Sequence, residues 1–294
     1  MILVDQSLPF FKGNTHAHTT NSDGRVSPEE SMRQYKEAGY DFLALTDHWF
    51  VGEEKQYQGM LVLPGVEYDF TFPTQVLHLI ALYPHAKYGA GLRRGMDYRE
   101  VIAHINRVGG VVIAAHPAWS LNTTEFLCSL DGVEIAEVYN TVSGEPFNGP
   151  RANSESLLDV AAANGKLFNL AASDDSHFYQ GEQCRSFLMV QAAELTVPTI
   201  LDALKNGRFY SSQGPEFRKI EIVGNEVRVE TTPVSQITVC SNRVWVDGRC
   251  RQGDALTERI YIIQPGEKFI RIQITDHAGK KAWSNPIPLS IDQP

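Results

Sequence analysis

Short apolar runs alternate with segments of helical pattern along roughly the first 210 residues of this chain. The runs that predict strands are 11–19, 42–46, 60–66, 76–82, 111–115, 133–139, 168–172 and 187–190. The segments that predict helices are 27–39, 97–108, 151–164 and 196–206. Continuous apolar strands separated by helices are typical of a parallel sheet that helices cover. Seven or eight such units favour a closed or nearly closed α/β barrel.

The first predicted helix has clear boundary signals. Ser27 is a candidate N-cap, Pro28 suits the first helical turn, and Glu30 would complete a capping box. Gly39 follows the last residue of the helical pattern, where glycine commonly ends a helix. These signals support the assignment of strands and helices in turn.

The pattern changes to period two near Gly214-Pro215. Apolar residues then alternate with polar ones, as in 220–222, 227–229, 237–239 and 270–274, and glycine turns separate the runs. The sequence therefore predicts a barrel over residues 1–213, followed by a small antiparallel β-sandwich of about seven strands over 214–294. This second segment holds no candidate ligand cluster. It is interpreted as a packing or oligomerisation module, with carbohydrate or partner binding as the alternative.

Side chains that can bind metal ions follow directly after several predicted strands. They are His16, His18, Asp23, His48, Glu67, His78, His116, Asp175 and His177. Residues i and i+2 of a strand share one face, so His16 and His18 could bind one ion together, and Asp175 and His177 repeat this spacing. Imidazole and carboxylate groups are typical ligands of zinc, manganese and iron. His85, His104 and His277 lack this context and are interpreted as ordinary polar residues.

The number of candidates indicates more than one ion. A catalytic zinc ion typically takes about three protein ligands. Nine candidates exceed that need and predict two to three divalent ions, zinc, manganese or iron, with Glu67 as a bridge between two of them.

Charge restricts the class of partner. The net charge is −9, and the densest basic clusters are the pairs 93–94 and 280–281. Long nucleic acid is not expected to bind such a surface. Three divalent ions, offset by three carboxylates and a hydroxide, would still leave the site at about +2. The sequence therefore predicts a small anionic substrate, such as a phosphate ester.

Cysteines and targeting signals bear on location. The four cysteines, at 128, 184, 240 and 250, show no C-x-x-C spacing, which suits a reducing compartment. Residues 1–14 lack the features of a signal peptide, and no apolar run approaches the ~20 residues of a membrane span. We expect a cytoplasmic protein without membrane contact, and leave open whether it forms a homo-oligomer.

Several motifs resemble those of the polymerase and histidinol phosphatase (PHP) family of metal-dependent hydrolases. They are Asn14-Thr15-His16-Ala17-His18-Thr19, Ser22-Asp23-Gly24, Thr46-Asp47-His48, Pro64-Gly65-Val66-Glu67, Ala115-His116-Pro117 and Asp175-Ser176-His177. The resemblance covers roughly residues 11–213. It implies a distorted (β/α)7 barrel and hydrolysis of phosphate esters at two or three metal ions.

The resemblance also implies a ligand set for each ion. One ion would take His16, His18, Glu67 and Asp175, a second would share Glu67 and add His78 and His116, and a third would take Asp23, His48 and His177. Some relatives have histidine at the position of Asp23. Segments 207–210, 276–279 and 282–286 resemble a branch that includes a carbaryl-type carbamate and ester hydrolase.

These inferences give a mechanism and its alternatives. A hydroxide held between the first two ions would attack phosphorus, and the residues assigned to catalysis are Glu67, Asp175 and His177. The residues assigned to substrate binding are Asn140, Arg151 and Arg185, because they follow strand ends and the arginines can fork onto phosphate oxygens. Trp119 and Tyr139 could stack on a leaving group or pack in the core. The alternatives are a carbamate or carboxylic-ester hydrolase and a non-catalytic, metal-stabilised binding module.

Overall fold

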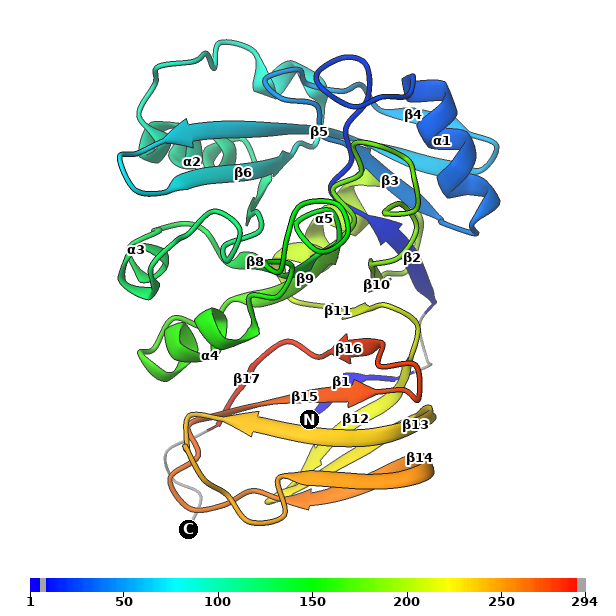
Figure 1. The fold of residues 1–294 in the computed structure, drawn as a ribbon, viewed down its shortest axis with the longest axis vertical. Helices are drawn as coiled ribbons and strands as arrows, with labels where there is room; N and C mark the ends of the chain where they lie inside the picture. The colour runs from blue at the N-terminus through cyan, green and yellow to red at the C-terminus, as the bar shows by residue number, and fades with distance from the viewer. Residues whose placement is uncertain (6–8, 290–294) are drawn as a thin grey trace.

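Two parts are stacked along the long axis of the molecule in the computed structural model (Figure 1), which describes residues 1–5 and 9–289. The upper part contains helices and strands, and the lower part is drawn as strands. Residues 6–8 and 290–294, which the sequence assigned to the barrel and to the β-sandwich respectively, lie outside the described residues.

The upper part runs from β2 to β11. Its strands are β2 (Phe10–Asn14), β3 (Phe42–Leu45), β4 (Lys55–Tyr57), β5 (Met60–Thr71), β6 (Val76–Leu82), β7 (Val111–Ala114), β8 (Ile135–Asn140), β9 (Asn169–Ser173), β10 (Phe187–Gln191) and β11 (Phe209–Ser212). Its helices are α1 (Pro28–Glu37), the short 3-10 helix η1 (Ala86–Gly89), α2 (Tyr98–Arg107), α3 (Thr124–Cys128), α4 (Glu155–Ala163) and α5 (Val197–Lys205). The sequence did not predict β4, α3 or β11.

Helix α1 begins and ends where the sequence predicts. The Glu30 N–H donates a hydrogen bond to the Ser27 hydroxyl, and Pro28 lies in the first turn, where its missing N–H leaves no bond unmade. The Glu30 carboxylate accepts hydrogen bonds from Arg33 and Gln34 instead of completing the predicted capping box. After the helix, Gly39 has a φ of 77°, in the left-handed region that glycine adopts without steric cost.

The sheet of the upper part is mixed, whereas the sequence predicted a parallel sheet. Strands β2, β3 and β5 are parallel neighbours, and so are β7, β8 and β9. β6 is antiparallel to β5 and β7, and β10 is antiparallel to β2 and β11. The predicted parallel order is wrong at these strands. For β5 and β6 the reason is the turn between them, which is too short for a crossover helix. The mixed α/β class is established, and the (β/α)7 barrel stays a prediction.

The alternation of side chains in β5 and β6 positions two candidate ligands. Leu61 and Leu63 of β5 and Ile80 of β6 lie in the same buried apolar cluster. Glu67 shares the face of Leu61 and Leu63, and His78 shares the face of Ile80, because residues two apart in a strand point the same way. Both polar side chains therefore point to the same side of the sheet as this apolar cluster.

The lower part also includes the first residues of the chain. Its strands are β12 (Phe217–Val223), β13 (Glu226–Ser241), β14 (Cys250–Ile262), β15 (Phe269–Thr275), β16 (Lys281–Trp283), β17 (Ile287–Pro288) and β1 (Ile2–Val4). β1, which the sequence did not predict, is antiparallel to β12, and Val4 is buried in the lower core. The first strand therefore packs with the lower part rather than with the upper sheet.

Residues 283–285 tie the two parts together. Trp283 is fully buried in the upper core, with its ring stacked 5.9 Å from that of Tyr139. The Asn285 side chain accepts a hydrogen bond from the Leu170 N–H of β9 (2.7 Å) and donates one to the Phe209 carbonyl of β11 (2.9 Å). Among the described residues, β9 and β11 form no ladder with each other. Asn285 thus bridges a gap in the upper sheet.

An ion pair makes a second connection between the parts. Arg271 of β15 is 2% exposed and donates through Nε and Nη2 to the two carboxylate oxygens of Asp159 in α4, at 2.6 and 2.7 Å. This fork fits a carboxylate in one orientation. Removal of Asp159 would leave the buried Arg271 charge without this partner, so the pair helps to fix how β15 lies against α4.

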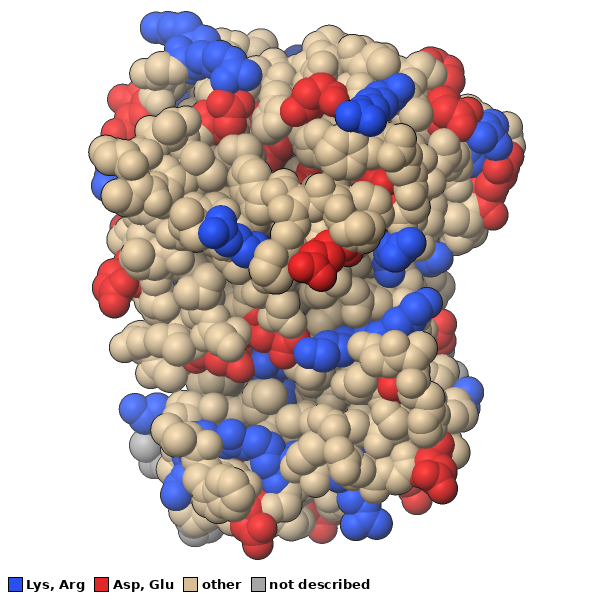
Figure 2. Space-filling model, in the orientation of Figure 1, with Lys and Arg blue, Asp and Glu red and all other residues tan. Residues whose placement is uncertain are grey.

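Charged side chains are distributed over both parts of the surface. On the face drawn in Figure 2, Lys and Arg are interspersed with Asp and Glu. Among the described residues, no helix is long and apolar enough to cross a membrane. In contrast to this mixed surface, acidic groups are concentrated inside the upper part, where the candidate ligands lie.

We predict that Trp283→Ala lowers the free energy of unfolding by roughly 3–5 kcal/mol, because the indole fills the upper core from the lower part. Urea unfolding followed by circular dichroism measures the change. Trp245→Ala is the matched control, since Trp245 is 79% exposed and its loss should change the free energy by less than about 0.5 kcal/mol. Equally small effects of the two substitutions would contradict this account of the junction.

Candidate metal centre

The candidate ligands come from distant segments and meet in the upper part. Three overlapping groups have ligand atoms within 4.8 Å of one another, and their members are His16, His18, Glu67 and Asp175; His18, Asp23, His48 and His177; and His48, Glu67 and His78. His116 joins the cluster through its Nε2 atom, 3.4 Å from Glu67 Oε1. The structure therefore brings all nine together.

The remaining histidines lie elsewhere and contact backbone atoms. His85 accepts a hydrogen bond from the Lys87 N–H at the start of η1. The Nε2 atom of His104 lies 2.6 Å from the Tyr88 carbonyl, and that of His277 lies 2.5 Å from the Asp254 carbonyl. These contacts are those of ordinary polar side chains.

Glu67 is placed between two sets of imidazoles. Its Oε1 lies 2.9 Å from His78 Nδ1 and 3.3 Å from His16 Nε2, close to His116. Its Oε2 lies 3.1 Å from His18 Nε2 and 3.3 Å from His48 Nδ1. The carboxylate is 1% exposed. Each oxygen thus faces a different set of ring nitrogens, which is the geometry expected of a carboxylate shared by two ions.

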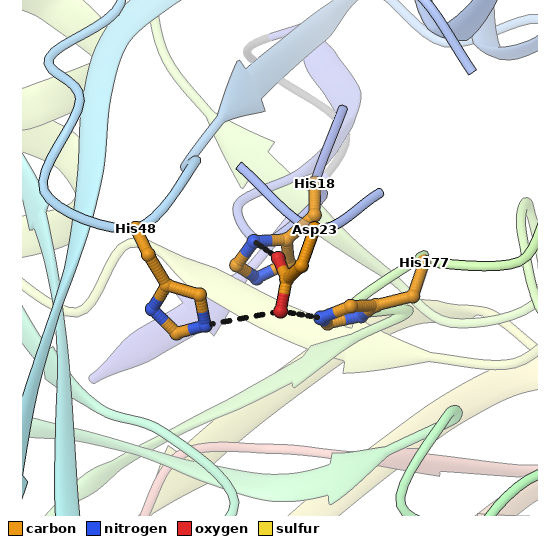
Figure 3. Close-up of side chains that lie close together, drawn as sticks. All are labelled: His18, Asp23, His48 and His177. Atoms are coloured by element: carbon orange, nitrogen blue, oxygen red, sulfur yellow. Dashed lines mark ion pairs between the residues drawn. The ribbon is translucent and has the colours of Figure 1, made fainter. Parts of the chain in front are cut away.

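Asp23 connects three imidazoles at the outer side of the cluster (Figure 3). Its Oδ1 lies 3.4 Å from His18 Nδ1, and its Oδ2 lies 3.5 Å from His177 Nε2 and 3.7 Å from His48 Nε2. The Asp23 side chain is 54% exposed. This outer group is open to solvent, whereas Glu67 is enclosed.

Asp175 supplies the test of whether the residues fit a metal ion. Its Oδ1 lies 3.0 Å from His16 Nε2 and 3.1 Å from His18 Nε2, and those two nitrogens are 3.2 Å apart. The oxygen is buried and has no hydrogen-bond partner within the described part of the chain. A buried carboxylate oxygen without a partner is costly. A divalent cation among these atoms would satisfy it, so the donor set fits a metal.

The electrostatics of the cluster favour positive charge. Burial alone would lower the pKa of His16, but the carboxylates of Asp175, Glu67 and Glu137 outweigh it and raise that pKa well above its usual value. The pKa of His18 is raised in the same way by Asp175 and Glu67 against the effect of burial. The enclosed pair His16 and His18 therefore favours positive charge, as protons or as metal ions that displace them. His48 differs, because burial lowers its pKa.

The backbone is strained at two of the candidate ligands. His116 has a φ of 32° and Asp175 a φ of 53°, in the region that residues other than glycine seldom adopt. The His116 N–H donates to Glu137 Oε2 (2.8 Å), and the Asp175 N–H donates to the His16 carbonyl (2.9 Å). These bonds hold both residues in the strained conformation, which directs their side chains into the cluster.

Glu137 supports the cluster from behind and was not among the predicted site residues. It is fully buried, and its Oε1 lies 2.9 Å from His16 Nδ1. It also accepts hydrogen bonds from the Ser173 hydroxyl (2.5 Å) and the Asn140 amide (2.8 Å). If Nδ1 carries the N–H and donates it to Glu137, the lone pair of Nε2 is left to bind a metal ion. The signal available in the sequence was an acidic residue between the apolar Ala136 and Val138, although the exposed Glu134 occurs in the same run.

Asp47 positions the loop that carries two candidate ligands. It accepts hydrogen bonds from the Thr19 N–H and hydroxyl, both 2.7 Å, and from the Ser22 hydroxyl at 2.8 Å. The Ser22 oxygen in turn lies 3.3 Å from His18 Nδ1 and 3.0 Å from Asp23 Oδ1. Asp47 therefore acts on the ligands through Ser22.

The three residues assigned to substrate binding lie in different surroundings. Asn140 is fully buried, and its amide donates to Glu137 Oε2 (2.8 Å) and to Asp175 Oδ2 (3.2 Å), so it orients acidic groups of the cluster. Arg151 and Arg185 are exposed, and neither lines the cavity above the cluster. The two arginines were selected because they follow strand ends, but this position in the sequence does not place their side chains in the cavity wall.

A cavity of about 290 Å³ opens over the cluster. Its lining residues are Asp23, His48, Glu67, His78, His116, Trp119, Val142, Ser143, Asn148, Asp175, His177 and Phe178. Besides the ligands, the lining includes residues of the segments that follow β7, β8 and β9. Tyr139, the second aromatic candidate for stacking, contacts Trp283 at the junction of the two parts instead.

No protein-family model and no curated protein sequence matches the chain. Among solved structures, a two-domain protein from Bacteroides vulgatus containing a predicted PHP-like metal-dependent phosphoesterase matches with a TM-score of 0.53 at 17% identity, over 99% of this chain and 97% of that one. Two further structures are more distant. One is a candidate metal-dependent phosphoesterase from Bifidobacterium adolescentis, with a TM-score of 0.40 at 18% identity, over 56% of this chain and 87% of that one. The other is an amidohydrolase from Chromobacterium violaceum with bound sulfate and no metal, with a TM-score of 0.42 at 14% identity, over 58% of this chain and 89% of that one. The chain thus shares the fold of the Bacteroides protein along nearly its whole length.

We predict that Glu137→Gln weakens metal binding by roughly 10- to 100-fold, because the amide cannot orient the His16 ring as the carboxylate does. Competition with a metal-sensitive chelating dye measures the affinity, and circular dichroism checks the fold. Glu230→Gln is the matched control, since Glu230 is exposed on β13. Unchanged affinity in folded Glu137→Gln protein would show that Glu137 does not support the ligands.

Proposed function

We propose that this protein is a PHP-type metal-dependent hydrolase of small-molecule phosphate esters, mono- or diesters. The observation that carries the proposal is Glu67, whose two oxygens face different sets of imidazoles inside one enclosed cluster. Its support lies in the donor set, in the cavity above that set and in a fold shared with a protein that contains a predicted PHP-like phosphoesterase.

The proposed ions would be held by three sets of residues. They are His16, His18, Glu67 and Asp175; Glu67, His78 and His116; and Asp23, His48 and His177. Within the first set, His16 approaches Glu67 Oε1, together with His78 and His116, whereas His18 approaches Oε2, together with His48. When bound, divalent ions lower the pKa of coordinated water towards ~7 and neutralise charge on phosphoryl oxygens. The third set includes the half-exposed Asp23, so we expect it to exchange its ion most readily.

The residues assigned to catalysis orient this chemistry. Glu67 fixes the relative positions of the two enclosed sets. Asp175 faces His16 and His18, and its carbonyl accepts a hydrogen bond from His177 Nδ1 at 2.7 Å. This bond leaves the Nε2 atom of His177 directed at Asp23, on the cavity wall. These contacts support a role in binding and orientation for all three residues.

A phosphoryl group suits this site better than a carbonyl group. Three sets of ligands surround one cavity, and a phosphoryl group offers up to three non-bridging oxygens to them, whereas a carbonyl offers one. The alternative is a carbamate or carboxylic-ester hydrolase. It is favoured by one observation, that no Lys or Arg lies among the described residues that line the cavity. A neutral ester would need no such side chain.

Glu67→Gln should lower kcat/KM by at least about 100-fold, because the substitution removes a charge that two ions would share. Elemental analysis should find close to three ions per chain in the wild type and about one in the variant. The control is Glu258→Gln, an exposed glutamate of β14. Near-normal turnover and full metal content in Glu67→Gln would exclude Glu67 as a shared ligand.

Substrates with a common leaving group would separate the two hydrolase hypotheses. We expect metal-loaded protein to release 4-nitrophenol from 4-nitrophenyl phosphate or bis(4-nitrophenyl) phosphate with a higher kcat/KM than from 4-nitrophenyl N-methylcarbamate or 4-nitrophenyl acetate. Chelated protein is the blank for each compound. Faster metal-dependent turnover of the carbamate or the acetate would establish the alternative, and no metal-dependent turnover of any compound would support a binding module.

A further inference from the structure

Aromatic side chains flank the cluster at two places. The Trp119 ring lies 4.8 Å from that of His116 and 5.8 Å from that of His78, in edge-on contacts. The Phe178 ring lies 6.2 Å from that of His177. Both rings line the cavity, together with the buried Val142. An organic group attached to a phosphoryl group in this cavity would therefore meet apolar surface beside the ligands.

The aromatic wall is fixed in place by its own contacts. Glu182 is fully buried and accepts hydrogen bonds from the N–H groups of Phe178 and Tyr179, each at 2.5 Å. The guanidinium of Arg25 lies 4.7 Å from the centre of the Phe178 ring. Trp119 lies within a turn that the Ser120 N–H closes by donating to the His116 carbonyl at 3.0 Å. A wall held in this way loses little conformational entropy when a ligand binds.

The charge of the cavity suits a single phosphoryl group. Three divalent ions would bring six positive charges, and the carboxylates of Asp23, Glu67 and Asp175 would cancel three of them. A phosphoryl dianion would neutralise most of the remainder. The described lining residues include no Lys or Arg, and Arg25 is stacked on Phe178 without lining the cavity, so a second anionic group beyond the ligands would find no cation on the cavity wall.

We propose that the substrate carries one phosphoryl group on a flat, largely apolar leaving group, such as an aromatic or heterocyclic alcohol, and that Trp119 and Phe178 select it. Nucleotide polyphosphates and bisphosphates are disfavoured because their further phosphates would meet an uncharged wall. This inference rests on the proposed function, and it adds the class of leaving group.

Three non-hydrolysable phosphonates test the selectivity on the metal-loaded wild type. Calorimetry would compare the Kd of methylphosphonate, phenylphosphonate and 4-phosphonobenzoate. Phenylphosphonate should bind roughly tenfold more tightly than methylphosphonate, because its ring is buried on the aromatic wall. 4-Phosphonobenzoate should bind more weakly than phenylphosphonate, because its carboxylate finds no partner.

Two variants assign the effect to the wall. Trp119→Ala should reduce the preference for phenylphosphonate to roughly threefold or less, while Trp245→Ala, at an exposed tryptophan of the lower part, leaves it unchanged. Asn148→Lys places a cation at an exposed lining position and should reverse the order of phenylphosphonate and 4-phosphonobenzoate. If Trp119→Ala loses its metal ions, the phosphonate affinities of the wild type and of Asn148→Lys still test the proposed class of leaving group.

The outcomes separate this inference from the proposed function. Equal affinity for methyl- and phenylphosphonate, or tighter binding of 4-phosphonobenzoate by the wild type, would overturn the class of leaving group and leave phosphate-ester hydrolysis standing. Failure of all three phosphonates to bind the metal-loaded protein would overturn both. Tenfold preference in the wild type with no loss in Trp119→Ala would overturn the role of Trp119.

Discussion

The buried carboxylate of Glu67 is the contact on which the rest of the site depends. Five imidazoles approach its two oxygens within 3.4 Å, and the group is almost fully removed from solvent. Burial of a carboxylate in such a place is strongly unfavourable unless positive charge surrounds it. The imidazoles provide that charge when protonated, and divalent cations would provide more of it. The cluster is therefore stable as a cation site and poorly suited to any neutral role.

Two further buried acids, Glu137 and Asp47, hold the ligands around Glu67 in position. Glu137 fixes His16 and the strained backbone of His116, and Asp47 fixes the loop that carries His18 through Ser22. The lower part contributes as well. Asn285 bonds β9, the strand that leads to Asp175, to β11 across the gap in the upper sheet. The β part thus holds no ligand cluster within its described residues, yet it supports the strand behind one ligand.

The sequence predicted the features that rest on local patterns. Helix α1 could be bounded from Ser27 and Gly39, because capping chemistry is local. Ligands after β2, β3, β7 and β9 could be selected because a polar side chain followed each apolar run. Features that depend on pairing were missed. The short turn before β6 is a local sign of its antiparallel pairing with β5, but nothing local reveals that β6 is also antiparallel to β7, or that β1 pairs with β12 more than 200 residues away.

The substrate residues show the same limit. Glu137 was passed over although an acid within an apolar strand is a visible signal, while Arg151 and Arg185 were selected for following strands and are exposed away from the cavity. Side-chain direction, not order along the chain, decides such cases.

The most direct test of the central claim, that Glu67 is shared by two metal ions, is anomalous diffraction from crystals grown with Mn²⁺. The account predicts two manganese peaks, each about 2.2 Å from a different oxygen of Glu67, and a third beside Asp23. A single peak, or peaks that leave Glu67 without a metal contact, would contradict it.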